Sequence, residues 1–378
     1  MFTTPLLTPL VACLSLMLAT LAPASGQPGA AASPTPSLSP TPTLTPTATL
    51  TPTPTPAPAE QGLSIFHACI LGVVEGITEY LPVSSTGHLI LTSNLLGIKT
   101  PAFKRAIDDF EIIIQGGAIL AVLGLYWSRF AQMFRGILGK DPDGLRLFIN
   151  VCIAFVPAAG IGFFLNSTIK SYLFFPVPVI IAMIVGGVYM LVIDTLVIKP
   201  RRARALAGTG IKPGIEVKPG TEVKPGMDTS ATAEGREVTD LTPVQALIIG
   251  FMQVLAMWPG TSRSMMTITG GVLVGLKPRA AAEFSFLLGM PTLLAATLYS
   301  LYKNLKQSKE IGEPNMFVQL GYLPVAVGII VAAISAAIAV KWLVGFLNRH
   351  GLAPFGYYRI VLGAVLIVLL MMGKLQVG

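Results

Sequence analysis

Long apolar stretches alternate with short polar loops along most of the chain. From residue 107 onward, six of these stretches are long enough for a helix to cross the hydrocarbon core of a bilayer, which takes about 20 residues. They cover residues 107–127, 145–165, 176–198, 279–302, 320–342 and 355–373. This pattern predicts an all-α polytopic membrane protein.

Four further apolar stretches are too short to span, or are broken by polar turns. They lie at residues 63–81, 86–98, 242–258 and 264–277, and they form two pairs, each joined by a polar loop. Irregular backbone at membrane depth is tolerated only where it is buried in protein or lines a wet cavity. We therefore expect each pair to be a re-entrant helix pair that enters and leaves on the same side.

The two pairs match each other at a constant separation of 178 residues, from Gly72 and Gly250 to Ser84 and Ser262. Some equivalent positions carry different side chains in the second copy: Gln253 replaces Glu75, Arg263 replaces Ser85, and Ser264 replaces Thr86. Three spans follow each pair, and three crossings are an odd number. The sequence therefore predicts two inverted-topology repeats, each a re-entrant pair plus three transmembrane helices, with a binding site at mid-membrane.

These patterns divide the chain into five segments. Residues 61–199 form the first membrane repeat and residues 241–378 the second, joined by a flexible cytoplasmic loop at 200–240. Residues 1–26 are an apolar segment typical of a signal peptide, although no basic residue precedes the apolar run. Residues 27–60 form a disordered linker, because nine Pro, nine Thr and three Ser within 33–58 cannot build a core.

Composition agrees with a membrane protein, since only 12% of the 378 residues are charged and the mean hydropathy is +0.71. The net charge of +8 does not indicate nucleic-acid binding, because Lys and Arg gather in the cytoplasmic loops of such proteins. Basic residues cluster at 129–146 and 199–204. These loops are expected to be cytoplasmic, so the first re-entrant pair opens to the outside.

Two carboxylates, Glu75 and Glu79, stand four residues apart and share one helix face. A pair of Glu in a soluble protein is usually a solvated face. Here the neighbours are apolar, so either one carboxyl is protonated or a cation lies between them. A hard divalent ion, Mg²⁺ or Ca²⁺, binds through one or two carboxylates together with substrate phosphate.

The polar loop after Pro82 carries Ser84, Ser85 and Thr86, followed by His88. Hydroxyls and free N–H groups at a helix N-terminus bind phosphate, although Ser and Thr are also ordinary helix caps. A single His is more often a packed residue than a functional one. Beside two Glu and three hydroxyls, His88 is a candidate acid, base or nucleophile.

The second loop supplies the cation. Arg263 lies between Ser262 and Ser264, with Thr267 one turn further on. A guanidinium suits bidentate phosphate contact, whereas an arginine that only reaches toward the membrane surface needs no function. The two loops together indicate a centre that splits a lipid-linked phosphate or diphosphate, with water or a Ser as nucleophile.

Two motifs carry a resemblance to a known family. They are Glu75-Gly-x-Thr-Glu79-x-Leu-Pro-x-Ser-Ser-Thr-Gly-His88 and Pro259-Gly-x-Ser-Arg263-Ser-x-x-Thr267, and both are similar to those of the undecaprenyl-diphosphatase (bacitracin-resistance) family, over roughly residues 61–378. The resemblance implies hydrolysis of undecaprenyl diphosphate to the monophosphate and inorganic phosphate. It also implies recycling of the lipid carrier for peptidoglycan synthesis, bacitracin resistance, divalent-cation dependence, and a site in the bacterial inner membrane that faces outward.

By position, the resemblance assigns metal binding or water activation to Glu75 and Glu79. It makes His88 and Arg263 catalytic and Ser85 the favoured nucleophile, while Ser85, His88 and water all remain open. The remaining hydroxyls line the substrate phosphate: Ser84, Thr86, Ser262, Ser264 and Thr267. A transporter or flippase of a phosphorylated polyprenyl lipid is the competing function, and a homodimer is one oligomeric state that the sequence allows.

Overall fold

The computed structural model describes residues 62–373, apart from 101–102, 174, 209–234 and 313. The signal-like segment at 1–26 and the linker at 27–60 lie outside these residues. Within them the fold is helical, with no strand and one isolated bridge between Arg236 and Leu276. The elements of the first half are α2 (Ile65–Thr78), α3 (Ser85–Leu95), α4 (Lys104–Ile113), α5 (Gln115–Leu125), α6 (Trp127–Ile137), α7 (Pro142–Leu173), α8 (Pro176–Ile193), the π-turn η1 (Asp194–Ile198) and α9 (Lys199–Gly208). Those of the second half are η3 (Val238–Asp240), α10 (Pro243–Leu255), α11 (Arg263–Leu273), α12 (Pro278–Ile311), α13 (Met316–Leu320), α14 (Tyr322–His350) and α15 (Ala353–Met371).

Five helices of the described chain are long and apolar enough to span a membrane, or six if a bent pair counts as one span. They are Pro142–Leu165, Pro176–Ala205, Pro278–Ile311, Tyr322–His350 and Ala353–Met371, with the bent pair at Lys104–Leu125 and Trp127–Ile137. These elements lie on the six predicted spans. A multi-pass membrane protein is therefore confirmed.

The first span differs from the expected single helix. The chain bends by 76° between α5 and α6, at Tyr126, whose backbone leaves the α-helical region. The start of α7 then runs back along α6, and Gly136 and Gly144 allow the two helices to approach closely. A Cβ on Gly136 would lie 2.5 Å from the Gly144 carbonyl carbon. The basic residues predicted for a loop after residue 127 therefore lie partly on a helix.

The predicted loop at 200–240 also begins later than expected. Helix α8 continues through η1 into α9 and reaches Gly208. Pro200 has no N–H to give to a helical carbonyl, and the π-helix η1, which ends two residues before it, changes the hydrogen-bond register. The helix therefore passes Pro200 instead of ending there. Residues 209–234 lie outside the described chain.

The predicted short pairs form as α2–α3 and α10–α11. The four helices have 14, 11, 13 and 11 residues. At about 1.5 Å per residue they reach roughly 16–21 Å, less than a ~30 Å hydrocarbon core. Each pair turns at a serine with positive φ, which is 75° at Ser84 and 76° at Ser262. Such a backbone costs about 1–3 kcal/mol in a residue other than Gly and is typical of functional turns.

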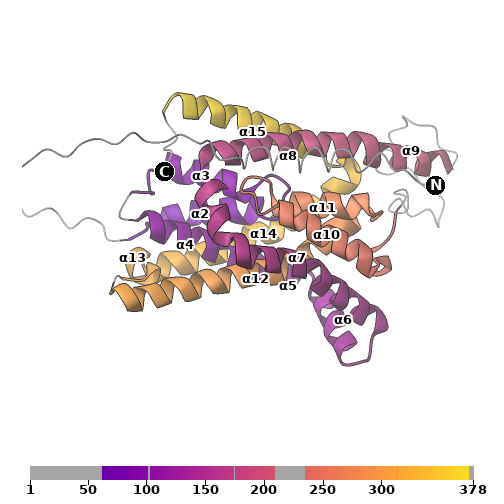
Figure 1. Cartoon of the computed structure of the whole chain (residues 1–378), viewed down its shortest axis with the longest axis horizontal. Helices are drawn as coiled ribbons and strands as arrows, with labels where there is room; N and C mark the ends of the chain where they lie inside the picture. Colours follow the sequence, from indigo (N-terminus) through magenta and orange to yellow (C-terminus); the bar gives the residue numbers. More distant parts are fainter. Residues whose placement is uncertain (1–61, 101–102, 174, 209–234, 313, 374–378) are drawn as a thin grey trace, which may run out of the picture. The chain divides into compact units, whose positions relative to one another are not determined.

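Each short pair is held by a long helix from the other half. Helix α2 packs along α14 and α10 packs along α7, while α8 and α15 run side by side (Figure 1). Small residues make this possible: a Cβ on Gly72 would lie 3.3 Å from the Ala332 amide nitrogen, and one on Gly250 would lie 2.9 Å from the Ala154 Cα. Close helix contact through small residues is a common packing mode in membranes.

Figure 1 shows the α2–α3 pair toward the end of the molecule that carries α4 and α13, and the α10–α11 pair toward the end that carries α6 and α9. The two polar turns meet between them. The inverted repeat and its orientation stay predictions, and the arrangement of the turns is what positions the site.

Candidate active site

Glu79 lies at the centre of the cluster that the two turns form. It is the C-cap of α2, and its side chain is 6% exposed. Its Oε2 accepts a hydrogen bond from the Ser85 hydroxyl at 2.7 Å, and its Oε1 accepts one from Arg263 Nη2 at 3.0 Å. The first motif ends α2 at Glu79 and starts α3 at Ser85, so the Ser85 hydroxyl lies on the Glu79 carboxylate. Arg263 of the second motif balances the negative charge of this carboxylate.

Arg263 is the first residue of α11, and its side chain is 11% exposed. Beside the bond to Glu79, its Nη1 donates to the Ser285 carbonyl at 2.9 Å, and its guanidinium carbon lies 5.3 Å from the centre of the Tyr80 ring. Its buried Nε has no hydrogen-bond partner among the described residues. An ion pair so poorly exposed interacts more strongly than it would in water. The guanidinium is therefore fixed, and its Nε–H is available to a further acceptor.

Direct bonds join the two turns. The Ser264 hydroxyl donates to the Leu81 carbonyl at 2.9 Å and lies 3.0 Å from the Ser262 hydroxyl. The Thr267 hydroxyl lies 2.6 Å from that of Ser285. Ser262, Ser264 and Thr267 thus lie together at the second turn, and their contact with a substrate phosphate stays a prediction. Their hydroxyls have internal partners, so they fix the turn at least as much as they offer contacts to a ligand.

The serines at the start of each short second helix act as caps. The Ser84 hydroxyl accepts from the Gly87 amide and the Ser262 hydroxyl accepts from the Met265 amide. The capping interpretation of the first loop is therefore confirmed at Ser84, and Ser262 caps α11 in the same way. Thr86 lies in the first turn of α3 and is half-buried.

Glu75 is one turn before Glu79 on α2 and is completely buried. Neither of its carboxylate oxygens has a hydrogen-bond partner among the described residues. Gln253, which holds the corresponding place on α10, is also buried, and its Oε1 accepts weakly from Thr292 at 3.4 Å. A buried carboxylate without a partner is costly. Glu75 is thus suited to a cation rather than to a structural role.

His88 is bound on both sides of its ring. Its Nδ1 lies 2.7 Å from the Ser84 carbonyl and its Nε2 lies 2.7 Å from the Tyr358 hydroxyl. A carbonyl can only accept, so Nδ1 carries a proton, and in the neutral ring Nε2 accepts from the tyrosine. The two rings are parallel within 6°. His88 is therefore turned toward α15, while the Glu79–Ser85–Arg263 cluster forms without it.

Arg359 is a residue of the site that sequence reasoning missed. It lies on α15, is completely buried, and donates to carbonyl groups of both turns: Nη1 to Pro82 at 3.5 Å and Nη2 to Gly260 at 2.8 Å. Two further bonds, both of 3.1 Å, reach the carbonyls of Ala182 and Met183 on α8. An arginine inside an apolar span is itself a sign of function, and the predicted span at 355–373 contains this one.

Comparison with known proteins follows the same motifs. The sequence model of the family "Bacitracin resistance protein BacA" matches residues 68–365, which include both turns and Arg359. This chain belongs to that family. Its relatives include an "Undecaprenyl-diphosphatase" from Sorangium cellulosum, 42% identical over 80% of this chain and 85% of the relative. Proteins of the same name from Wolinella succinogenes (41% identical) and Deinococcus radiodurans (39%) are matched over 97% of their own lengths.

The residues present fit the divalent cation that resemblance to the family implies. No three His, Cys, Asp or Glu side chains gather as a metal cluster in the described chain. A cation held by few protein ligands and by substrate oxygens needs no such cluster. Both oxygens of Glu75 lack protein partners, and Glu79 keeps lone pairs beyond its two bonds. These two carboxylates are therefore the residues that would hold the ion.

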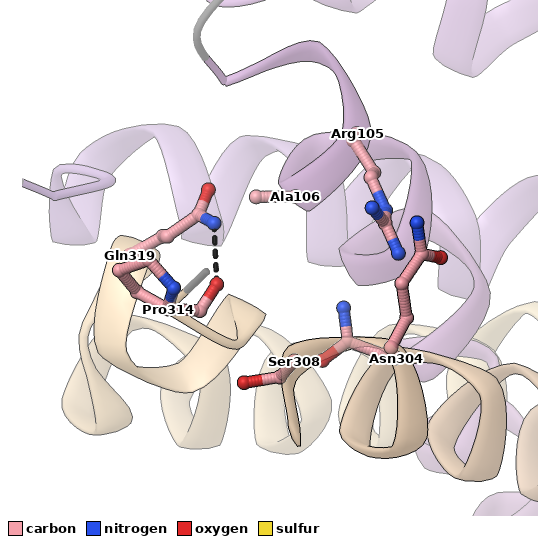
Figure 2. Close-up of a pocket in the computed structure, with 7 residues that line it drawn as sticks. Arg105, Ala106, Asn304, Ser308, Pro314 and Gln319 are labelled. Carbon is pink, nitrogen blue, oxygen red and sulfur yellow. Dashed lines mark hydrogen bonds between the residues drawn. The ribbon is translucent and has the colours of Figure 1, made fainter. Parts of the chain in front are cut away.

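A cavity of about 370 Å³, lined by both polar and apolar side chains, lies away from these residues, between α4, α5 and α12. Figure 2 shows the smaller pocket beside it, where the side chain of Arg105 extends toward Asn304 and Gln319 binds the Pro314 carbonyl. Asp109 on α4 accepts from Asn304 at 2.6 Å and from Ser300 at 3.2 Å. These bonds join α4 to α12. None of the family motif residues lines either cavity.

Proposed function

We propose that the protein is an integral-membrane hydrolase that converts undecaprenyl diphosphate to undecaprenyl phosphate and inorganic phosphate. The observation that carries this proposal is the contact of Glu79 with both Ser85 and Arg263. A nucleophile within hydrogen-bond distance of a base, with that base oriented by a third group, is the arrangement of an activated nucleophile. The names of the relatives agree with this substrate.

In the proposed reaction the Ser85 hydroxyl gives its proton to Glu79 Oε2, and its oxygen attacks the terminal phosphorus. The bond from that phosphorus to the bridging oxygen breaks, and the bridging oxygen leaves with the lipid as undecaprenyl phosphate. Arg263 lies where negative charge gathers on the transferred group and lowers the energy of that state. Its Nε–H, which has no partner among the described residues, is a donor available to a phosphoryl oxygen.

The second half of the reaction restores the enzyme. Water attacks the phosphoseryl group, the Oγ–P bond breaks, and Glu79 returns its proton to the Ser85 oxygen as inorganic phosphate forms. A divalent ion bound by Glu75 and Glu79 would add positive charge at the diphosphate and orient it. The strained turn at Ser84 holds the start of α3, so that Ser85 faces Glu79.

Phosphate release by the purified protein tests the proposal. We expect release from undecaprenyl diphosphate with Mg²⁺ or Ca²⁺, and loss of release with a chelator. Glu79→Gln keeps the size of the side chain and removes the base, so release should fall by at least about 100-fold. Rapid acid quenching followed by peptide mass spectrometry should detect phosphorylated Ser85. Release that continues unchanged in Ser85→Ala would transfer the nucleophile role to water or His88.

The same proposal includes place and physiological role. Two short helix pairs that enter from opposite ends, each packed on a long helix of the other half, support inverted repeats with the site at mid-membrane. With the basic loops in the cytoplasm, the site of this inner-membrane protein would face outward, recycle the lipid carrier for peptidoglycan synthesis and confer bacitracin resistance. Cysteines placed at Gly97 and Gly139 should react with an impermeant maleimide from the outside and the inside, respectively.

A further inference from the structure

We propose that Gly289 of α12 is a positioning residue for the reaction: it provides the notch in which the guanidinium of Arg263 lies. A Cβ at this position would stand 2.7 Å from Arg263 Cζ and 2.8 Å from Nη2. Both distances are shorter than real Cβ contacts allow. The flat face of the guanidinium therefore lies on the helix backbone at the one place where no side chain projects.

The hydrogen bonding of Arg263 fits this notch. Its Nη1 donates to the carbonyl of Ser285, which is four residues before Gly289 on the same helix. In an α-helix this carbonyl also accepts from the Gly289 amide. Arg263 thus contacts one short stretch of the α12 backbone: it donates to the Ser285 carbonyl and packs against Gly289. Its other arm remains directed at Glu79.

The second buried arginine of the site is seated in the same way. Arg359 Nη2 donates to the carbonyl of Ala182 on α8, and the residue four places later is Gly186. A Cβ at Gly186 would lie 3.1 Å from Arg359 Cζ. Two unrelated helices therefore use a carbonyl and a glycine four residues apart to hold a guanidinium. Because the arrangement occurs twice, we regard it as a specific binding position for a guanidinium, called a seat below, and not as an accident of packing.

This notch matters for the reaction because it restricts the guanidinium of Arg263 to one orientation. If a side chain filled the notch, the guanidinium would have to move away from α12, and its bonds to Ser285 and Glu79 could not both persist. A displacement of about 1 Å in a positioned group can lower a rate by about 100-fold. This inference rests on the proposed function for its kinetic consequence, and on the geometry alone for the seat itself.

Gly289→Ala tests the seat, because the nearest atoms to the added methyl belong to a side chain and not to backbone. We expect kcat/KM for phosphate release from undecaprenyl diphosphate to fall by about 100-fold. The control is Gly345→Ala on α14, where an added Cβ meets nothing within 4 Å. It should leave kcat/KM unchanged. Wild-type kcat/KM in Gly289→Ala would overturn the proposal.

A thermal double-mutant cycle separates the seat from the catalytic assignment. In the detergent-solubilised protein, Gly289→Ala should lower Tm by several degrees, because it displaces the guanidinium from its partners. In an Arg263→Ala background the three atoms nearest to the added methyl are gone and alanine favours the helix, so the same change should leave Tm unchanged or raise it. An equal loss of Tm in both backgrounds would overturn the proposal. If the cycle holds but the wild type releases no phosphate, the seat stands and the proposed function fails.

Discussion

Replacing Glu75 by leucine is expected to stabilise the metal-free protein and to abolish its activity. The carboxyl is completely buried, and its two oxygens have no hydrogen-bond partner among the described residues. Exchanging a buried ion pair for apolar groups of similar volume is often stabilising, by about 1–4 kcal/mol, and we expect a gain of the same order for a buried carboxyl whose desolvation no partner offsets. With a Tm change of about 2–4 °C per kcal/mol, the rise should be roughly 2–16 °C.

The assay is thermal unfolding in detergent with a chelator, repeated with Mg²⁺. A ligand at 100 times its Kd stabilises the folded state by about 2.7 kcal/mol, so the wild-type Tm should rise with the ion while Glu75→Leu should not respond. Gln253→Leu is the control, since it changes the corresponding buried position of α10 and leaves Glu75 in place. It should keep the response to Mg²⁺. A Glu75→Leu protein that is less stable than the wild type in chelator, or that still responds to Mg²⁺, would refute the reasoning.

Three further predictions concern residues around this carboxylate. Arg263→Lys should lower kcat by about 100- to 1,000-fold, because a point charge cannot bind Glu79, Ser285 and a phosphoryl oxygen together; phosphate release at saturating substrate measures this. Arg359→Met should lower the free energy of unfolding by about 2–6 kcal/mol, since two buried loop carbonyls lose their donor at about 1–3 kcal/mol each. The control is the same change at the exposed Arg349, and equal Tm values for Arg359→Met and Arg349→Met would contradict the prediction. Tyr358→Phe keeps the ring against His88 and removes one hydrogen bond worth about 1 kcal/mol, so kcat/KM should fall by about fivefold, while Tyr357→Phe changes nothing.

Helices and turns could be predicted because they depend on local pattern. The predicted stretch 63–81 became Ile65–Thr78, and 242–258 became Pro243–Leu255. The match at a separation of 178 residues predicted that Ser84 and Ser262 are equivalent. The structure confirms this to within a degree of φ. Composition and period were sufficient here, since a lipid-embedded backbone has few alternatives to a helix.

The partners of the site residues could not be predicted, because they come from helices distant in the chain. The sequence predicted that Arg263 and Glu79 belong to one site, since both lie in unusual polar turns, but not that they form an ion pair. It did not show Ser285 or Gly289, which stand in an ordinary apolar helix and act through a carbonyl and a missing side chain. His88 was placed correctly in its turn. Its bond to Tyr358, 270 residues away, depends on how α15 packs.

The bonds of Arg359 have a consequence for the mobility of the two halves. One guanidinium holds Pro82 of the first turn and Gly260 of the second, and the Ser264–Leu81 bond crosses the same boundary. Rocking one half against the other, as an alternating-access carrier does, would have to break these bonds between the two turns in every cycle. The two turns are instead bonded to each other and to one buried arginine at the centre of the helix bundle. These bonds therefore favour a site that stays fixed between the turns over one that opens alternately to the two sides of the membrane.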